Sequence, residues 1–189
     1  TTPAGVGTNT WAITATNPYA GASHYRGAGT AAVTDQRLVS PPVEVPTGED
    51  PVVLRFWHAP NLETSGTTGC WDAGILEIST NGGTTWTQVL NADLLLGGYE
   101  RTVNSSSNPL STLPGWCGPN PSPYQQAIAN LTPYAGQTVQ FRWRIGTDGS
   151  VSRPGWDVDD VVVQSCSTSP IFSDGFDGGT TLNWSATHP

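Results

Sequence analysis

Three carboxylates stand close together in the stretch GWDVDDVVVQS, residues 155–165. Asp157, Asp159 and Asp160 interrupt a run of valines that otherwise predicts a buried β-strand. Neighbouring carboxylates repel one another and cost free energy to bury unless cations, hydrogen bonds or water compensate. The sequence therefore predicts a compensating partner for these acids.

The rest of the chain offers few groups arranged for catalysis. His24, His58 and His188 show no metal-ligand spacing such as HExxH. There is no G-x-S-x-G elbow, and the absence of Lys excludes a P-loop lysine and a Schiff-base lysine. Asp72 and Glu77 could in principle form an acid pair of the glycosidase type, although we read their segment as a strand. We expect the protein not to be an enzyme.

The composition limits the class of protein. With 189 residues the chain fits one domain, and its 22 Gly and 16 Pro, with only 12% charged residues, indicate short strands joined by turns. The net charge is −8 and all seven basic residues are Arg, which argues against nucleic acid and anionic membranes. No apolar run approaches the roughly 20 residues that cross a bilayer. Because there is no Met, we expect a processed or excised piece of a secreted protein.

The three cysteines suggest one disulfide. Cys70 and Cys117 each lie beside a Trp in loop-like sequence, so a bond between them is plausible. Cys166 would then be free or paired with another segment or subunit. A disulfide and an acidic, Lys-free, Trp-rich chain favour an extracellular setting.

Alternation of period two predicts most of the strands. In QTVQFRWRIG, Val139, Phe141, Trp143 and Ile145 share one face, which is typical of a half-buried strand. Eight such strands suit an all-β fold, a two-sheet antiparallel jelly-roll sandwich. The segment 91–123 is a long loop, and loops of that length are usually functional or tied down. The eight predicted strands are 10–16, 31–40, 51–58, 74–79, 84–90, 125–131, 137–146 and 157–164.

Two of the eight Trp residues are candidates for ligand binding. Exposed Trp rings stack on sugar rings, while flanking polar groups form hydrogen bonds with the sugar hydroxyls. Most Trp residues of a sandwich must fill its core, but Trp71 and Trp116 lie in loop sequence beside the cysteines. Packing within the loop is the alternative for both.

Several stretches together resemble the MAM-like jelly-roll modules of bacterial secreted proteins, which are often appended to extracellular peptidases. They cover most of residues 10–165 in the expected order. The matching stretches are RLVSPP (37–42), LRFWH (54–58), DAGILEISTNGGTTW (72–86), NLTPYAGQTVQFRWRIGTD (130–148) and GWDVDDVVV (155–163).

The resemblance implies a module over residues 1–166 and a structural calcium site. In related jelly rolls the first Asp of a terminal DDV joins such a site, which implies Asp159, with Asp160 beside it, as metal ligands here. Asp35 and Asp72 are further candidates. The alternatives are that these acids cap turns, pair with Arg142 or Arg144, or face water.

The tail, residues 167–189, resembles the opening strand of a further module. The family's FE-G…W start is missing at the N-terminus, whereas the tail contains FSDGFDGG and a Trp184 that matches Trp11. With Phe172 and Phe176, this tail could fill the open sheet edge of a neighbouring copy and build a head-to-tail fibre. Alternatively it closes its own sheet or is a linker.

Three functions follow as hypotheses. The first is an accessory module of a secreted enzyme, for adhesion or substrate targeting to a cell-surface protein or glycan. The second is a subunit that self-associates through its tail into a fibre or surface layer. The third is a carbohydrate-binding module, with Trp116→Ala as its test.

Overall fold

The computed structural model describes residues 6–165 and 171–177 of the chain. These residues form strands and one short 3₁₀ helix. In chain order the elements are β1 (Ala12–Thr14), β2 (His24–Gly29), β3 (Val33–Val39), β4 (Val43–Glu44), β5 (Val53–Asn61), β6 (Thr64–Ser65), β7 (Gly69–Cys70), β8 (Ala73–Ser79), β9 (Thr87–Gln88), β10 (Leu94–Leu96), β11 (Arg101–Val103), β12 (Pro114–Gly115), β13 (Gln125–Asn130), η1 (Thr132–Tyr134), β14 (Thr138–Asp148), β15 (Arg153–Gln164) and β16 (Phe172–Asp174).

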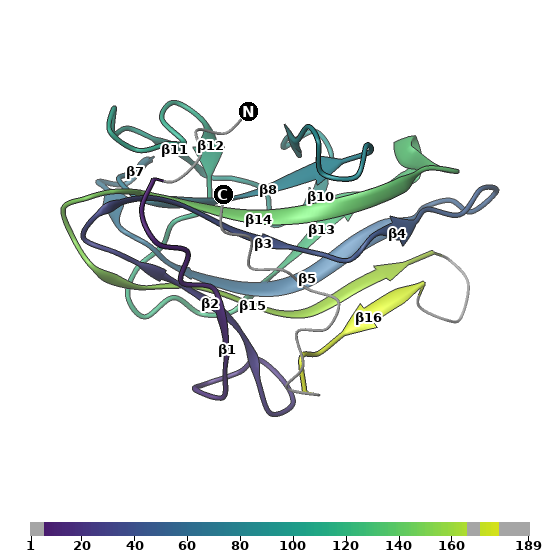
Figure 1. Cartoon of the computed structure of the whole chain (residues 1–189), viewed down its shortest axis with the longest axis horizontal. Coiled ribbons are helices and arrows are strands. Elements are labelled where there is room, and N and C mark those ends of the chain that lie inside the picture. Colours follow the sequence, from purple (N-terminus) through teal and green to yellow (C-terminus); the bar gives the residue numbers. More distant parts are fainter. Residues whose placement is uncertain (1–5, 166–170, 178–189) are drawn as a thin grey trace.

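Two sheets, antiparallel throughout, form a β-sandwich (Figure 1). The larger has the order β1-β2-β15-β5-β13-β10, with β16 also on β15. The other has the order β3-β14-β8-β9, with β4 also on β14. A third, small sheet, β12-β11-β7-β6, lies at the upper left of Figure 1 and contains a parallel pair, β7 and β11. The predicted all-β sandwich is confirmed.

Each of the eight predicted strand segments overlaps an observed strand. The sequence pattern missed β2, HYRGAG, because its glycines hide any apolar alternation. Packing explains Gly27: a Cβ there would lie 2.6 Å from the Ile145 side chain and 2.7 Å from Trp11. The glycine thus lets β2 approach the aromatic core closely.

The core lies between the two large sheets. The predicted inner face of β14 is buried, and the ring of its Trp143 packs edge-on against Phe56 of β5, with centroids 5.5 Å apart. The opposite face of β14 was expected to be half-exposed, but Arg142 and Arg144 are buried too. They pair with carboxylates of the neighbouring strands, and Arg142 lies 4.4 Å over the ring of Trp86.

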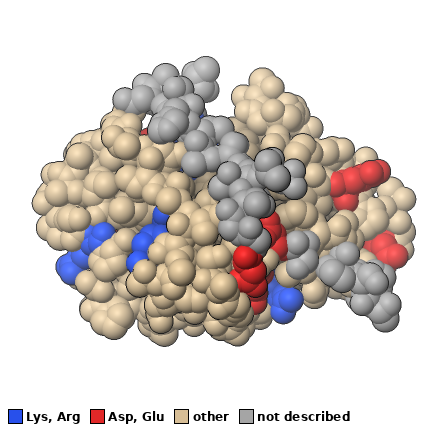
Figure 2. Space-filling model, turned by 60° about the horizontal axis from the view of Figure 1, so that its bottom comes forward, with Lys and Arg blue, Asp and Glu red and all other residues tan. Residues whose placement is uncertain are grey.

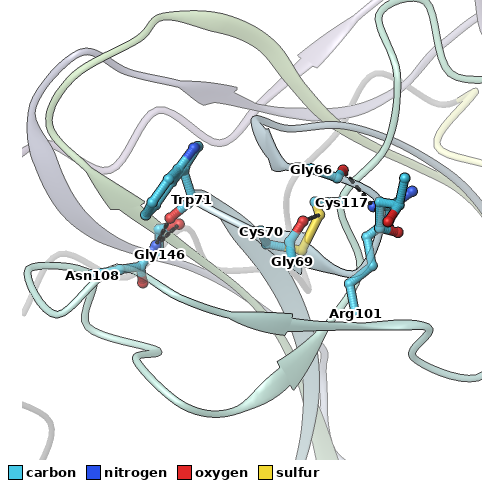
Figure 3. The surroundings of a disulfide bond; sticks show 9 residues. Gly66, Gly69, Cys70, Trp71, Arg101, Asn108, Cys117 and Gly146 are labelled. Carbon is cyan, nitrogen blue, oxygen red and sulfur yellow. Dashed lines mark hydrogen bonds between the residues drawn. A yellow bond between two sulfur atoms is a disulfide. The ribbon is translucent and has the colours of Figure 1, made fainter.

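The predicted long loop, residues 91–123, is tied down. It contains β10, β11 and β12, and a disulfide joins its Cys117 to Cys70 of β7, with an S–S distance of 2.00 Å. Arg101 of β11 also donates to the carbonyl oxygens of Gly66 and Thr67, at 3.2 and 2.6 Å (Figure 3). The disulfide and these hydrogen bonds therefore join strands and turns of the small sheet to one another, while an isolated bridge between Trp116 and Gly74 of β8 connects this region to the sandwich.

The described part of the tail belongs to the same sandwich. β16 pairs with the end of β15, so that Phe172 lies opposite Val163, and Phe176 is 2% exposed with its ring edge-on to Tyr25 at 4.9 Å. Residues 171–177 thus pair with the sheet of their own chain, as in the alternative that the tail closes its own sheet, and strand donation to a neighbouring copy stays a prediction. Trp184 lies outside the described residues.

Charged side chains are sparse on the face shown in Figure 2. Small groups of arginines and of acidic residues are scattered among mostly uncharged residues, and one arginine group lies beside an acidic group. The part of the chain that the structure describes forms no helix that could span a bilayer.

Candidate metal centre

Three carboxylates from distant parts of the sequence converge at one end of the strands. Glu63 lies between β5 and β6, Asp72 between β7 and β8, and Asp148 is the last residue of β14. One carboxylate oxygen of each lies within 4.8 Å of the other two. We call these three residues the acidic cluster.

Backbone hydrogen bonds hold the acidic cluster together. The N–H groups of Trp71 and Asp72 donate to the carbonyl oxygen of Glu63, at 2.9 and 3.2 Å. The N–H of Asp148 donates to Oδ1 of Asp72 at 2.8 Å. The Ser150 hydroxyl donates to Oδ1 of Asp148 at 2.9 Å. The positions of the carboxylates are therefore set by main chain as well as side chains.

Two carboxylate oxygens of the acidic cluster are buried without a hydrogen-bond partner. Asp72 is fully buried, and its Oδ2 accepts no hydrogen bond, nor does Oε2 of Glu63. Burial, aided by repulsion from Asp148 and Glu63, raises the pKa of Asp72 to about 7, although the Asp148 N–H opposes this. Burial and Asp148 likewise raise the pKa of Glu63, with Arg153 acting in the opposite direction. A bound cation would relieve both costs.

The chemistry of these donors fits calcium. The acidic cluster supplies only carboxylate oxygens, the hard ligands that calcium prefers, and no nitrogen or sulfur that would favour zinc. Calcium takes six to eight oxygens, so three carboxylates leave positions for carbonyl groups, water or a ligand. Of the residues predicted to bind metal, the structure brings only Asp72 into this cluster.

Asp35 is placed in an ion-pair network instead of the predicted metal set. Its Oδ1 accepts from Nε of Arg144 at 2.7 Å, and its Oδ2 accepts from Arg37 at 2.8 Å. Burial alone would raise its pKa, but the hydrogen bonds from Arg144 and Arg37 hold the pKa of Asp35 below its ordinary value. Glu77 belongs to the same network, since its Oε1 lies 3.2 Å from Nη1 of Arg144. This arrangement is the ion-pair alternative named from the sequence.

The acids of β15 are compensated by hydrogen bonds and an ion pair. Asp159 accepts from the backbone N–H groups of Tyr19, Ala20 and Asp160, at 2.8, 3.2 and 2.8 Å, and so fixes the turn that precedes β2. Asp160 has φ of 47° at the irregularity of β15 where pairing passes from β2 to β16. Asp157 pairs with Arg26, whose Nη2 donates to Oδ2 at 3.0 Å.

For Asp159 the structure favours the hydrogen-bonding alternative, and metal binding by Asp159 and Asp160 stays a prediction. Both oxygens of Asp159 already accept backbone hydrogen bonds, and neither residue joins an acidic group with metal-ligand geometry within residues 6–165 and 171–177. The compensating partner predicted for this strand is the protein's own backbone and Arg26.

The two candidate Trp residues differ in exposure. Trp116 is 3% exposed, and its ring packs 4.8 Å from His58 while its indole N–H donates to the carbonyl oxygen of Gly97 at 2.8 Å. The ligand-binding prediction for Trp116 is wrong, because the disulfide draws its loop over the core. Trp71 is 38% exposed, and ligand binding there stays a prediction.

The sequence analysis did not single out Glu63 or Asp148. Both acids follow predicted strands closely, and Asp148 opens an Asp-Gly turn. Acidic residues just beyond strand ends are a weak signal, because such residues also cap turns in water. Only the pairing of strands brings these two beside Asp72.

The comparisons with known proteins bear on this architecture. No model of a known protein family matches the sequence. The chain is similar to one part of Bacillopeptidase F. This protein of Bacillus subtilis (strain 168) is 27% identical over 160 residues, which amounts to 81% of this chain. The matched region is only 9% of Bacillopeptidase F, so the similarity concerns a small part of that protein.

Proposed function

We propose that this chain is a non-catalytic, calcium-stabilised β-sandwich module of an extracellular protein, accessory to a peptidase and of the MAM-like kind. The observation that carries the proposal is the acidic cluster, in which Asp72 and Glu63 each keep a buried oxygen without a partner. Such a site costs stability when empty and adds stability when calcium fills it.

Two further observations support the extracellular and accessory parts of the proposal. The Cys70–Cys117 disulfide is typical of proteins that fold in an oxidising compartment. The likeness to a small part of a protein named as a peptidase agrees with a module that accompanies a catalytic domain. The module then serves adhesion or substrate targeting beside that domain.

Calcium binding and thermal unfolding test the proposal. Titration calorimetry should show one calcium bound per chain. At free calcium 100 times Kd the unfolding free energy rises by about 2.7 kcal/mol, which for a chain of this size raises Tm by about 5–10 °C. Asp72→Asn should lose most of this shift, because it removes a charged ligand from the acidic cluster.

Asp159→Ala provides the matched control, since Asp159 is an equally buried aspartate. It should lower Tm in calcium-free buffer, because three backbone N–H groups lose their acceptor, yet keep the full calcium shift. No calcium binding by the wild type, or equal calcium shifts in wild type and Asp72→Asn, would contradict the proposal.

A further inference from the structure

Trp71 is the residue next to Asp72 of the acidic cluster in the chain, and its side chain is partly exposed. Its backbone N–H donates to the Glu63 carbonyl at 2.9 Å. Its own carbonyl accepts from the amide of Asn108 at 2.8 Å, and the same amide donates to Gly146 (Figure 3). The main chain at Trp71 is thus fixed on both sides while 38% of the residue stays exposed.

The surroundings of the acidic cluster combine open polar and apolar surface. Asp72 is buried, but Glu63 and Asp148 are only partly buried. Val151, in the turn that follows Asp148, is a second exposed apolar side chain, at 36%. A calcium ion held by three carboxylates has coordination positions left over, and the partial exposure of two ligands lets solvent or a ligand reach them.

We propose that calcium in the acidic cluster and the indole of Trp71 together bind a neutral sugar with vicinal hydroxyls. Two adjacent hydroxyl oxygens complete the calcium coordination, and the apolar face of the sugar ring stacks on the indole. A sugar suits this surface because it carries hydroxyls and an apolar C–H face on one small ring. Acidic glycans are disfavoured, since the chain carries a net charge of −8.

This inference rests on the calcium site of the proposed function, and a glycan array tests it. The labelled full chain is applied to neutral and sialylated glycans, in calcium and again in EGTA. We expect binding to a subset of neutral glycans in calcium and its loss in EGTA. The neutral glycan bound best is then titrated against the variants by calorimetry.

Three variants separate stacking, calcium and non-specific contact. Trp71→Ala should weaken sugar binding at least tenfold while leaving calcium binding unchanged, and Asp72→Asn should lose both. Leu95→Ala, which removes a more exposed apolar side chain on β10, should change neither.

The inference fails if wild type binds calcium but no neutral glycan, or if Trp71→Ala and Leu95→Ala bind sugar equally well. In both cases the calcium-stabilised module still stands. If the wild type binds no calcium, the proposed function fails with the inference. Calcium titration of the wild type without sugar distinguishes these outcomes.

Discussion

At the scale of single residues, identical side chains play different parts according to the groups around them. Asp35, Asp157 and Asp159 are all buried aspartates whose oxygens are taken by guanidinium, imidazole or backbone N–H groups. Asp72 is as deeply buried but keeps one oxygen without a partner. The unsatisfied acceptor, more than the presence of acids, marks the candidate metal site.

His58 should make stability depend on pH. Burial lowers the pKa of His58 to about 3, while its Nδ1 accepts from the indole N–H of Trp156 at 3.0 Å. The unfolded chain therefore binds a proton below pH 6.5 that the folded chain does not. The stability that depends on neutral His58 is fully present above pH 6.5, and it is lost as pH falls toward 3, at about 1.4 kcal/mol per pH unit.

Denaturant unfolding at several pH values between 4 and 7.5 checks this dependence. His58→Gln keeps an acceptor for Trp156 without titrating, so its unfolding free energy should fall less steeply with acid. The raised pKa of Asp72 acts with the opposite sign, since ionising it as pH rises toward 7 costs stability. Both forms are therefore measured in EGTA in an Asp72→Asn background, where equal slopes would contradict the prediction.

At the scale of elements, the disulfide of the small sheet lies close in the chain to the acidic cluster. Cys70 ends β7, and Asp72 follows two residues later. The small sheet has four short strands, of which only β11 has three residues. Its geometry therefore depends on the cross-link and on hydrogen bonds such as those of Arg101 and Asn108.

The double variant Cys70→Ser/Cys117→Ser should lose stability and calcium affinity together. Opening a bridge that spans 47 residues costs about 4 kcal/mol in the chain-entropy account. Because Asp72 follows Cys70 by two residues, we also expect calcium to bind several-fold more weakly when the bridge is open. Denaturant unfolding and calcium calorimetry measure the two effects, and unchanged calcium affinity would show that the disulfide does not hold the site.

At the scale of the whole molecule, β15 organises the large sheet. One neighbour of β15 is β5. The first part of β15 pairs with β2 and a later part pairs with β16, so this partner strand changes at Asp159 and Asp160. Phe176 then fills a place against Tyr25 in the core. The tail through residue 177 is therefore a structural part of the sandwich.

Truncation after Pro170 tests whether the tail closes its own sheet or that of a neighbour. The full chain should be monomeric by light scattering, and the truncated chain should lose about 3 kcal/mol or more of stability, as for removal of a buried Phe. Full-length Phe176→Ala serves as the control and should reproduce much of that loss. Strings or rings of the full chain that disappear on truncation would instead favour strand donation and the fibre hypothesis.

The sequence by itself determined most of the longer strands, the sandwich and the pairing candidates for the disulfide. These depend on local patterns: alternation such as that of residues 137–146 reports which face of a strand is buried, whatever the partner strand. Asp72 was a candidate ligand only beside the calcium site that the family resemblance implies.

Only the tertiary structure decided which acids meet. Glu63, Asp72 and Asp148 come together because strand pairing joins segments up to 85 positions apart in the chain, and Trp116 is buried because its disulfide-bonded loop folds over His58. Whether a carboxylate is satisfied depends on the N–H and guanidinium groups that arrive from those other segments, as at Asp159 and Asp35. These partners cannot be predicted from the local sequence, because a strand or turn elsewhere in the fold supplies each of them.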